Sequence, residues 1–427
     1  MTAVQIVKGG NLMAVGCGNG PPPPELVAKW RKDLGFNHIQ MADPHERAMA
    51  EADGIRRPVK ASWVRLYEVD KFGRFNMGLG YLKRIRRDIV AAGYTPEVIQ
   101  LSPPPEQMYR PDRFEADYAR LFRMGLDLRY RQDEALIAMD SNERCLLQAP
   151  PGFGKSYLFK SYCITHPKAK IHVVADGLSI CQRLFDDIAR SIPDVGQVGG
   201  GKKCWRRVTV LSADSVHKAE FEDPDHKAFA DVVLADEVHM LAAPEAWRKL
   251  LMYQWGRMYG VSANIGDRFD GADAALEPIF GEPAFQMTYQ EAEEAGLVTP
   301  IEVEWVEVWG EDPVYGQEEF CRRRRDGFKR LCYWEHDLRN DKIADKVASW
   351  PAEEQGLILT ETIEHLLHLK RRLPDLVLAY GPEGMDECRY RAAVANGILH
   401  PERDPKLDRP RLREIQFRFE RGEIKRA

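Results

Sequence analysis

The segment LLQAPPGFGKSYLFKSYC, residues 146–163, determines how the surrounding region folds. It opens with a short apolar run at 146–148, which predicts a buried strand, and closes with a run at 157–163, which predicts a helix. Gly152 and Gly154 lie in the loop between them. A glycine-rich loop between a strand and a helix is the setting of a phosphate-binding loop, because backbone N–H groups and the helix N-terminus both point at the anion.

The loop also carries the side chains that a nucleotide site needs. Lys155 is placed to reach the β- and γ-phosphates of ATP, and Ser156 is placed to ligate Mg²⁺. The alternative is a turn rich in glycine and proline with a chance Lys-Ser pair, and the strand–loop–helix context argues against it. We expect the nucleotide to contact Ala149, Pro150, Pro151, Gly152, Phe153, Gly154, Lys155 and Ser156.

A second motif, VVLADEVH at residues 232–239, ends an apolar run with two carboxylates. Asp236 is placed to hold the magnesium ion, and Glu237 is placed to polarise the attacking water. Two acids at a strand end are common by chance. The motif gains weight because further predicted strands separate it from Lys155, as the sheet of a P-loop ATPase requires. We therefore predict Lys155, Asp236 and Glu237 as the catalytic residues.

Residues 118–300 alternate short apolar runs with helical stretches. This alternation predicts an α/β domain in which helices cover both faces of a parallel sheet. The predicted strands lie at residues 146–148, 171–175, 208–211, 232–234 and 259–262.

The first 105 residues differ in pattern and predict a small α+β domain. Proline runs at 21–24 and 103–105 mark boundaries, because proline neither continues a helix nor donates to a sheet. Within this domain we expect a hairpin from 4–7 and 12–15, a helix at 25–34, a strand at 63–69 and a helix at 79–92.

The predicted helix at 79–92 carries four cations, Lys83, Arg84, Arg86 and Arg87. They either contact a nucleic-acid backbone or form an ordinary solvated face, and the charge pattern alone favours the second reading. The densest basic run, at residues 322–325, leaves the same two alternatives open.

Residues 301–427 form the third predicted region. We expect strands at 301–308 and 357–360, and a helix at 363–373.

Bulk composition excludes several classes of protein. The chain has 427 residues, 44% of them hydrophobic and 30% charged, which indicates folded domains and not a disordered chain. Its formal net charge is -5, which does not exclude a nucleic-acid partner, because one positive channel is enough. The eight cysteines form no C-x-x-C pair, so no zinc site or disulfide framework is predicted. We expect no membrane span and a cytoplasmic location.

Further motifs add a family resemblance. The stretch LRYRQ at 128–132 lies upstream of the phosphate loop, DEVH at 236–239 has the form of a DExH box, and SAN at 262–264 ends the strand that follows. With these motifs the chain resembles the superfamily 2 DNA helicases, and among them the UvsW-type phage helicases. The resemblance implies two RecA-like lobes and a small N-terminal accessory domain. It also implies that Gln132 reads the adenine edge, and that Ser262 and Ala263 couple hydrolysis to movement.

Two departures from the family pattern are present. Asn264 stands where the family has threonine, and Asp176 stands where its motif Ia has proline. The stretches 173–178, 199–203 and 208–215 resemble motifs Ia and Ib and their approach, which in the family face the nucleic-acid strand. The stretches 268–271, 279–281 and 296–300 match further family segments.

Near the C-terminus, residues 412–424 resemble the helix before motif V. Nothing after them resembles motif V or the arginine-bearing motif VI. The resemblance therefore implies an incomplete second RecA-like lobe, which a downstream polypeptide would complete.

Two functions stay open at this point. The first is an ATP-dependent helicase or translocase that remodels branched DNA or RNA–DNA hybrids in phage recombination or repair, with single-stranded or branched DNA as its partner. The second is a nucleotide-switched DNA-binding module without processive hydrolysis. A small-molecule P-loop kinase is disfavoured by the DEVH and SAN motifs.

Overall fold

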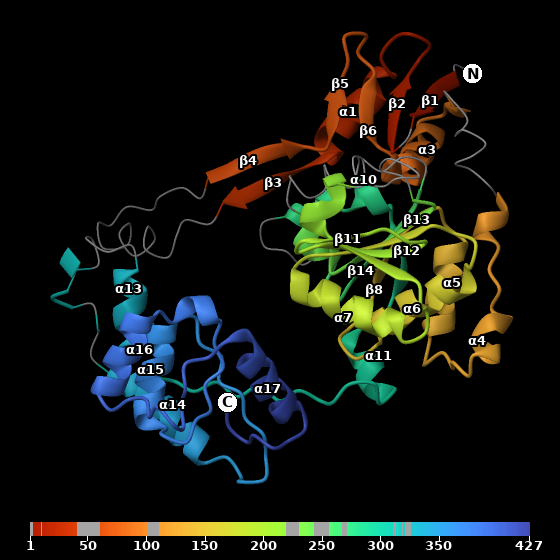
Figure 1. Cartoon of the computed structure of the whole chain (residues 1–427). Helices are drawn as coiled ribbons and strands as arrows, with labels where there is room; N and C mark the ends of the chain where they lie inside the picture. Colours follow the sequence, from red (N-terminus) through yellow and green to blue (C-terminus); the bar gives the residue numbers. More distant parts are fainter. Residues whose placement is uncertain are drawn as a thin grey trace. The chain divides into compact units, whose positions relative to one another are not determined.

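The computed structural model divides the chain into two compact units (Figure 1). The first combines Met1–Gln40 with Ala61–Ile301, and the second combines Met41–Lys60 with Glu302–Ala427. Within them the structure describes residues 3–9, 11–40, 60–100, 111–218, 230–242, 256–266, 271–310, 313, 315–317, 319–320 and 326–427. The predicted boundaries at residues 105 and 300 remain predictions.

The first unit is built on an eight-stranded sheet with the order β11-β10-β12-β9-β13-β14-β8-β15. All neighbouring strands run parallel except β11, which is antiparallel to β10 at one edge. The strands are β8 Arg144–Gln148, β9 Ile171–Ala175, β10 Val195–Gly199, β11 Lys202–Cys204, β12 Val208–Ser212, β13 Val232–Asp236, β14 Arg257–Ser262 and β15 Pro283–Gln286.

The five strands predicted for this sheet are confirmed, and three others were missed. The missed strands lack the apolar run that marks a buried strand: β10 reads VGQVG, β11 is the exposed edge KKC, and β15 begins with Pro283 at the opposite edge. The α/β class with a parallel sheet is therefore correct, and the fold of this region is RecA-like.

Helices cover one face of this sheet and form its main core. They are α5 Gln132–Asp140, α6 Lys155–Thr165 and α7 Leu178–Ala189, and their buried side chains join those of the strands in one cluster. Short elements cover the other face, among them η4 Val238–Ala242, η5 Ala272–Ala275 and α10 Glu277–Phe280. No described helix is both long and apolar enough to cross a membrane.

The N-terminal part of the first unit has its own five-stranded sheet, with the order β5-β6-β2-β1-β7. Its buried face packs on two helices, and Trp30 meets Phe75 edge to face at 5.8 Å between ring centroids. Its elements are β1 Ala3–Gly9, β2 Leu12–Gly16, α1 Pro24–Asp33, β5 Tyr67–Val69, β6 Phe75–Gly78, η1 Leu79–Tyr81, α3 Leu82–Ala91 and β7 Thr95–Gln100. The predicted hairpin and both predicted helices are confirmed.

The strand predicted at 63–69 is wrong as a single element. It is divided at Leu66 into β4 Lys60–Arg65, which pairs with β3 Gly35–Gln40, and β5, which pairs with β6. The Leu66 N–H donates to the carbonyl of Leu34 at 3.2 Å, so the chain leaves one ladder and enters another at this residue. The apolar pattern continues across Leu66 because the residues on both sides are strands, so the pattern does not reveal the break.

The N-terminal domain is packed tightly onto the RecA-like lobe. A Cβ on Gly78 would lie 2.2 Å from the Pro278 carbonyl oxygen, and one on Gly80 would lie 2.1 Å from the Glu277 carbonyl oxygen. Only glycine allows an approach this close. Beside this contact the buried Arg144 donates to the Ile279 carbonyl at 2.7 Å, and burial lowers the pKa of its guanidinium to about 10.

The cations of α3 serve this same contact. Arg84 pairs with Glu277 at 2.8 Å, Arg87 pairs with Glu282 at 2.7 Å, and Lys83 donates to Asn142. The fourth cation, Arg86, is exposed to solvent. The basic face of this helix thus binds the neighbouring lobe, so the nucleic-acid reading for Lys83, Arg84 and Arg87 is not supported.

The second unit is mainly helical in its described residues. The two predicted helices are confirmed as α15 Ile363–Arg372 and α17 Arg409–Glu420. They pack with α16 Glu387–Ala395 in a cluster that includes Leu366, Leu378 and Leu407. Helix α14 Asp337–Ala348 lies beside α15, where Asn340 and His365 are hydrogen-bonded at 3.0 Å.

The strands predicted at 301–308 and 357–360 are wrong. Residues 301–308 form neither helix nor strand, and Trp305 is 88% exposed. Their alternation of apolar and acidic residues satisfies the strand pattern without supplying a partner. Next to 357–360, Gly356 forms an isolated parallel bridge with Arg426. The Val377 N–H donates to the Arg426 carbonyl at 3.1 Å. The Ile358 N–H also donates to the Ala427 carbonyl at 2.8 Å, and the described residues after 301 form no strand ladder beyond this bridge.

Candidate nucleotide-binding site

The phosphate loop has the geometry that the sequence predicted. It runs from the end of β8 to Lys155, the first residue of α6. Gly152 and Gly154 both have left-handed backbones, with φ of 86° and 87°. Ala149 is buried and donates from its N–H to the Ser262 carbonyl at 3.0 Å, and the buried Phe153 ring packs near Phe285. The loop is therefore held at both ends while its glycines shape the turn.

Lys155 faces the acidic motif across the loop. Its Nζ lies 3.0 Å from Oε1 of Glu237, which follows β13 with a left-handed φ of 47°. Asp236, the last residue of β13, is buried. Burial first, and then the adjacent Glu237 carboxylate, raise the pKa of Asp236 above its usual value. One cation thus balances two neighbouring carboxylates.

The ion pair continues into a chain of polar contacts toward β14. Glu237 Oε2 lies 3.3 Å from His239 Nδ1, and the same nitrogen lies 2.8 Å from Ser262 Oγ. Ser262 is buried and its hydroxyl donates to the Asn264 carbonyl at 3.1 Å. Ala263 follows it directly, half-buried. Residues predicted from separate motifs therefore meet at one edge of the sheet, the carboxyl ends of β8, β13 and β14.

Gln132 is fully buried at the start of α5 and holds the phosphate loop. Its Oε1 accepts from the Arg129 N–H at 2.8 Å, and its Nε2 donates to the Phe153 carbonyl at 2.7 Å. A Cβ on Gly154 would lie 2.8 Å from this Nε2, so glycine is needed there. Its adenine-reading role stays a prediction; the contacts present tie the upstream segment to the loop.

A supporting group was not foreseen from the sequence. Arg131 has a left-handed φ of 57°, pairs with Glu134 at 3.0 Å and with Glu291 at 3.4 Å, and lies over the Phe285 ring. Glu291 completes a capping box with Thr288 at the start of α11 Tyr289–Glu294. The Thr-x-x-Glu spacing is a signal that would have located this helix.

The segment after α11 closes on the phosphate loop. A Cβ on Gly152 would lie 2.7 Å from the Leu297 carbonyl oxygen and 2.9 Å from the Val298 side chain. Tyr289 fixes the segment by donating from its hydroxyl to the Thr299 carbonyl at 2.6 Å. The predicted family stretch at 296–300 therefore lies against the phosphate loop and borders the candidate site.

The stretches predicted to face nucleic acid also lie together. Gly199, Gly200 and Gly201 all have positive φ, of 127°, 58° and 86°. A Cβ on Gly200 would touch the Leu178 side chain at 3.3 Å, and Lys202 donates to Gln182 at 2.8 Å. The predicted stretch at 268–270 and the basic run at 322–325 lie outside the described residues.

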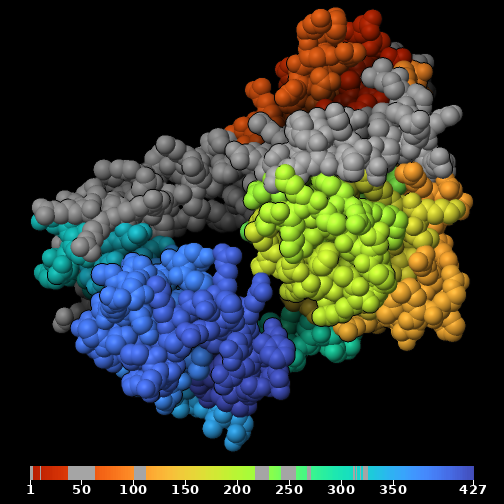
Figure 2. Space-filling view, viewed as in Figure 1, coloured from red at the N-terminus to blue at the C-terminus, as the bar shows by residue number. Residues whose placement is uncertain are grey.

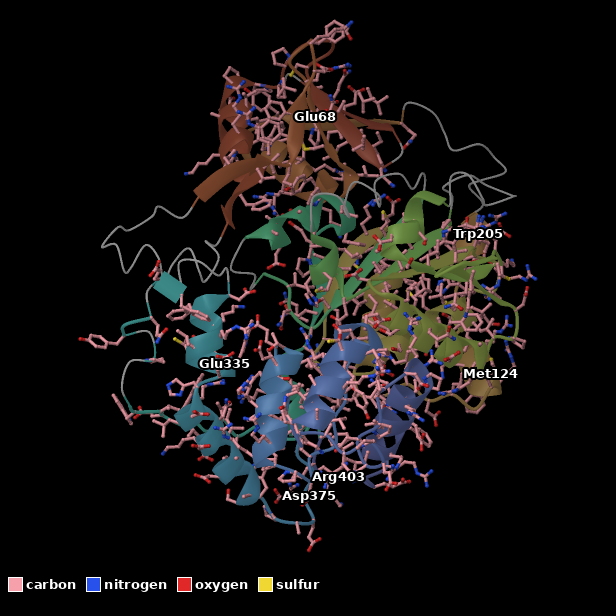
Figure 3. The ribbon with its side chains drawn as sticks, turned by 60° about the vertical axis from the view of Figure 1, so that its left-hand side comes forward. Glu68, Met124, Trp205, Glu335, Asp375 and Arg403 are labelled. Atoms are coloured by element: carbon pink, nitrogen blue, oxygen red, sulfur yellow. The ribbon has the colours of Figure 1, made fainter. Side chains whose placement is uncertain are left out.

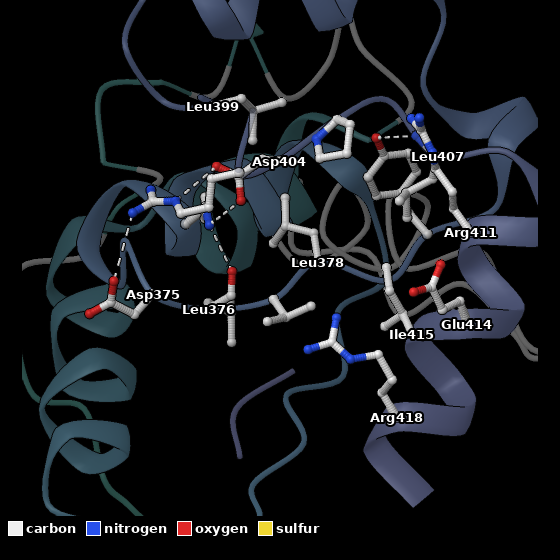
Figure 4. A pocket seen from close by; sticks show the side chains of 15 residues that line it. Asp375, Leu376, Leu378, Leu399, Asp404, Leu407, Arg411, Glu414, Ile415 and Arg418 are labelled. Atoms are coloured by element: carbon white, nitrogen blue, oxygen red, sulfur yellow. Dashed lines mark hydrogen bonds and ion pairs between the residues drawn. The ribbon is translucent and has the colours of Figure 1, made fainter. Parts of the chain in front are cut away.

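The second unit contains a cavity of about 340 Å³ (Figure 4). Leu376, Leu378 and Ile415 form its apolar lining. At its edge the buried Lys370 is saturated, because it donates to the Pro374 and Leu376 carbonyls and to Asp404. It contains no glycine-rich loop, so it is not the predicted ATP site.

Comparison with known proteins gives one family match. Residues 125–263 match the model of a family described as the type III restriction enzyme, res subunit. This stretch contains the phosphate loop, the DEVH motif and Ser262. No curated protein matches the chain.

Solved structures give low-scoring similarities. Two are of the UvsW helicase from bacteriophage T4, each at 16% identity and a TM-score of 0.43. One match covers 66% of this chain and 99% of that one, and the other covers 92% and 78%. A nuclease-deletion mutant of the type ISP restriction-modification enzyme LlaGI, solved with a DNA substrate mimic, matches at 12% identity and a TM-score of 0.33, over 68% of this chain and 31% of that one.

Proposed function

We propose that this chain, whose first unit contains a superfamily 2 helicase lobe, is an ATP-dependent DNA helicase or translocase. The observation that carries the proposal is the run of contacts from Lys155 through Glu237 and His239 to Ser262. It connects Lys155, which would meet the γ-phosphate, to Ser262 at the end of β14. Such a connection is of use to a motor, in which hydrolysis has to alter the grip on a second ligand, and is not needed by a simple kinase.

The site residues fit Mg²⁺ and ATP. Asp236 Oδ1 is buried and accepts no hydrogen bond within the described residues, which suits a carboxylate oxygen reserved for a cation. Asp236 and Ser156 would hold the ion, which supplies charge neutralisation between the phosphates. Lys155 would leave Glu237 and bind the phosphates. Glu237, released from its ion pair, would then accept a proton from the attacking water.

The partner we propose is DNA, single-stranded or branched, with an RNA–DNA hybrid as a further substrate. The adjacent stretches 173–178 and 199–203, which contain Leu178 and Lys202, would lie along the DNA backbone. A role in phage recombination or repair remains part of this proposal on the strength of the sequence resemblance alone.

The deciding experiment is steady-state ATP turnover with and without forked DNA. A motor gives turnover that DNA stimulates. A protein whose DNA affinity changes with ATP but which turns over no ATP is the alternative, a nucleotide-switched binding module. Phosphoryl transfer to a metabolite, without any effect of DNA, would contradict both.

Lys155→Ala should weaken ATP binding at least about tenfold, equivalent to about 1.4 kcal/mol. The substitution removes the charge that meets the phosphates and leaves the two carboxylates unbalanced. Nucleotide affinity is measured by titration calorimetry. Lys160→Ala is the matched control, since Lys160 lies on the same helix but over the Tyr157 ring, and it should bind ATP as the parent does. Equal affinity in Lys155→Ala and the parent would remove Lys155 from the site.

DNA binding should depend steeply on salt. Contacts to phosphates release counterions, so the logarithm of the affinity should fall linearly with the logarithm of the salt concentration. Fluorescence anisotropy of a labelled forked duplex over a salt series measures the slope. A flat dependence would contradict a backbone-tracking motor.

A further inference from the structure

We infer that the β5–β6 hairpin of the N-terminal domain is a nucleic-acid contact, in which Phe72 stacks on an unpaired base and Lys71 and Arg74 meet the flanking phosphates. This inference rests on the proposed function, since it assumes a nucleic-acid partner. It assigns a second contact, on a different domain from the lobe that binds ATP.

The first observation is that Phe72 is not needed by the fold. Phe72 is 48% exposed, while the other aromatic side chains of the hairpin, Tyr67 and Phe75, are buried and stack on each other at 4.8 Å. The domain core is complete without the Phe72 ring. A lone exposed aromatic is common on protein surfaces, so exposure alone decides nothing.

The second observation is the pair of cations gathered at the ring. Lys71 Nζ lies 5.0 Å from the ring centroid, and the Arg74 guanidinium carbon lies 5.3 Å from it. Both cations lie over the ring, so a base that stacks on Phe72 would take the place of one of them, and the displaced cation would meet the adjacent phosphate.

The third observation is that the tip is already ordered. The Asp70 carboxylate accepts from the N–H of Phe72 at 2.9 Å and from the N–H of Arg74 at 3.0 Å. It also accepts from Arg74 Nε at 2.7 Å. Gly73 supplies the left-handed residue of the turn, with φ of 79°. Little conformational entropy is therefore lost when a ligand binds here.

The fourth observation is the position of the tip. Strand β6 begins with Phe75 at the tip and ends with Gly78, which is packed on Pro278 of the lobe. The tip of the hairpin and the residue packed on the lobe, Gly78, are thus at opposite ends of β6. The hairpin therefore projects from the end of the domain that faces away from the lobe (Figures 1 and 2). Glu68, on the same hairpin, lies in this part of the molecule (Figure 3). A strand held there would extend the contact beyond the lobe surface.

The test is fluorescence anisotropy of the full chain with a fluorescein-labelled oligothymidylate. Phe72→Ala should weaken binding at least about fivefold, the loss expected for one stacked base. Phe72→Trp keeps a stacking ring and should bind like the parent. Val90→Ala removes an even more exposed apolar side chain, from α3, and should have no effect. Lys71→Ala should lower the salt slope by about one.

Two results would overturn the inference. One is a Phe72→Ala protein that binds as tightly as a parent that does bind. The other is a Phe72→Leu protein with parental affinity, since leucine keeps apolar area but cannot stack as a ring does. A parent that binds no nucleic acid at all, and whose ATP turnover DNA does not stimulate, would contradict the proposed function as well. Urea unfolding midpoints check that every variant is folded.

Discussion

Glu237→Gln should abolish ATP turnover and leave ATP binding intact. The amide has nearly the shape of the carboxylate but cannot accept a proton from water, and loss of a general base typically costs a factor of about 10² to 10⁴ in rate. Binding is retained because the neutral amide no longer competes with phosphate for Lys155, whose Nζ lies 3.0 Å from the Glu237 carboxylate in the parent. The measurements are DNA-stimulated turnover and nucleotide affinity on the same preparation.

The matched control is Glu134→Gln. Glu134 also pairs with a cation, Arg131 at 3.0 Å, but on the exposed side of α5, where an ion pair contributes little. That variant should hydrolyse ATP at the parental rate. If Glu237→Gln hydrolyses at that rate too, Glu237 is not the base, and the contact with Lys155 is only structural.

Gly80→Ala should destabilise the first unit, by roughly 1–3 kcal/mol or more. Helix propensity predicts the opposite sign, because alanine is favoured over glycine in a helical turn. Here the new Cβ would lie 2.1 Å from the Glu277 carbonyl oxygen and 2.7 Å from the Gly281 nitrogen, both backbone atoms, so the domain contact has to open. Urea unfolding followed by tryptophan fluorescence measures the change.

Gly20→Ala is the control in the same domain. Its Cβ would meet only the Cys17 carbonyl oxygen, at an ordinary 3.6 Å. It should shift the free energy of unfolding by less than about 1 kcal/mol. If both variants unfold at the parental urea concentration, the close packing of the N-terminal domain on α10 is not present in solution.

Local patterns carried the successful predictions. The loop between β8 and α6 and the strand that ends in Asp236 were each predicted from a motif of eight residues. In both cases the local sequence was enough to specify the backbone. The five buried strands were visible because parallel strands covered on both faces are continuous apolar runs. The hairpin at the N-terminus followed from two strands separated by a turn. For these elements the sequence alone was enough.

The failures depended on partners distant in the chain. Residues 301–308 have the alternation of a strand but no described strand beside them, and the run at 63–69 divides because Leu34 takes the Leu66 N–H. The ion pairs that Arg84 and Arg87 of α3 form with Glu277 and Glu282 could not be predicted from the sequence of the helix. Similarly, the support of the phosphate loop by Arg131 and Glu291 joins segments that lie far apart in sequence. The sequence pattern of a segment shows which structures it can form, and its contacts with distant residues decide which of them it forms.

The joint at Gly78 and Gly80 makes the N-terminal domain a stationary landmark for measurements on this protein. Because backbone meets backbone there, with no side chain between to yield, we expect the hairpin tip to keep a constant separation from the candidate nucleotide site. A dye on a cysteine introduced at Lys71 and a second on the exposed Cys388, with the exposed Cys204 replaced by serine, would therefore report displacement of the other unit alone. In the converse variant, which keeps Cys204 and has Cys388 replaced by serine, a dye on Cys204 read against the one at Lys71 should give an energy-transfer signal that stays flat through every nucleotide state.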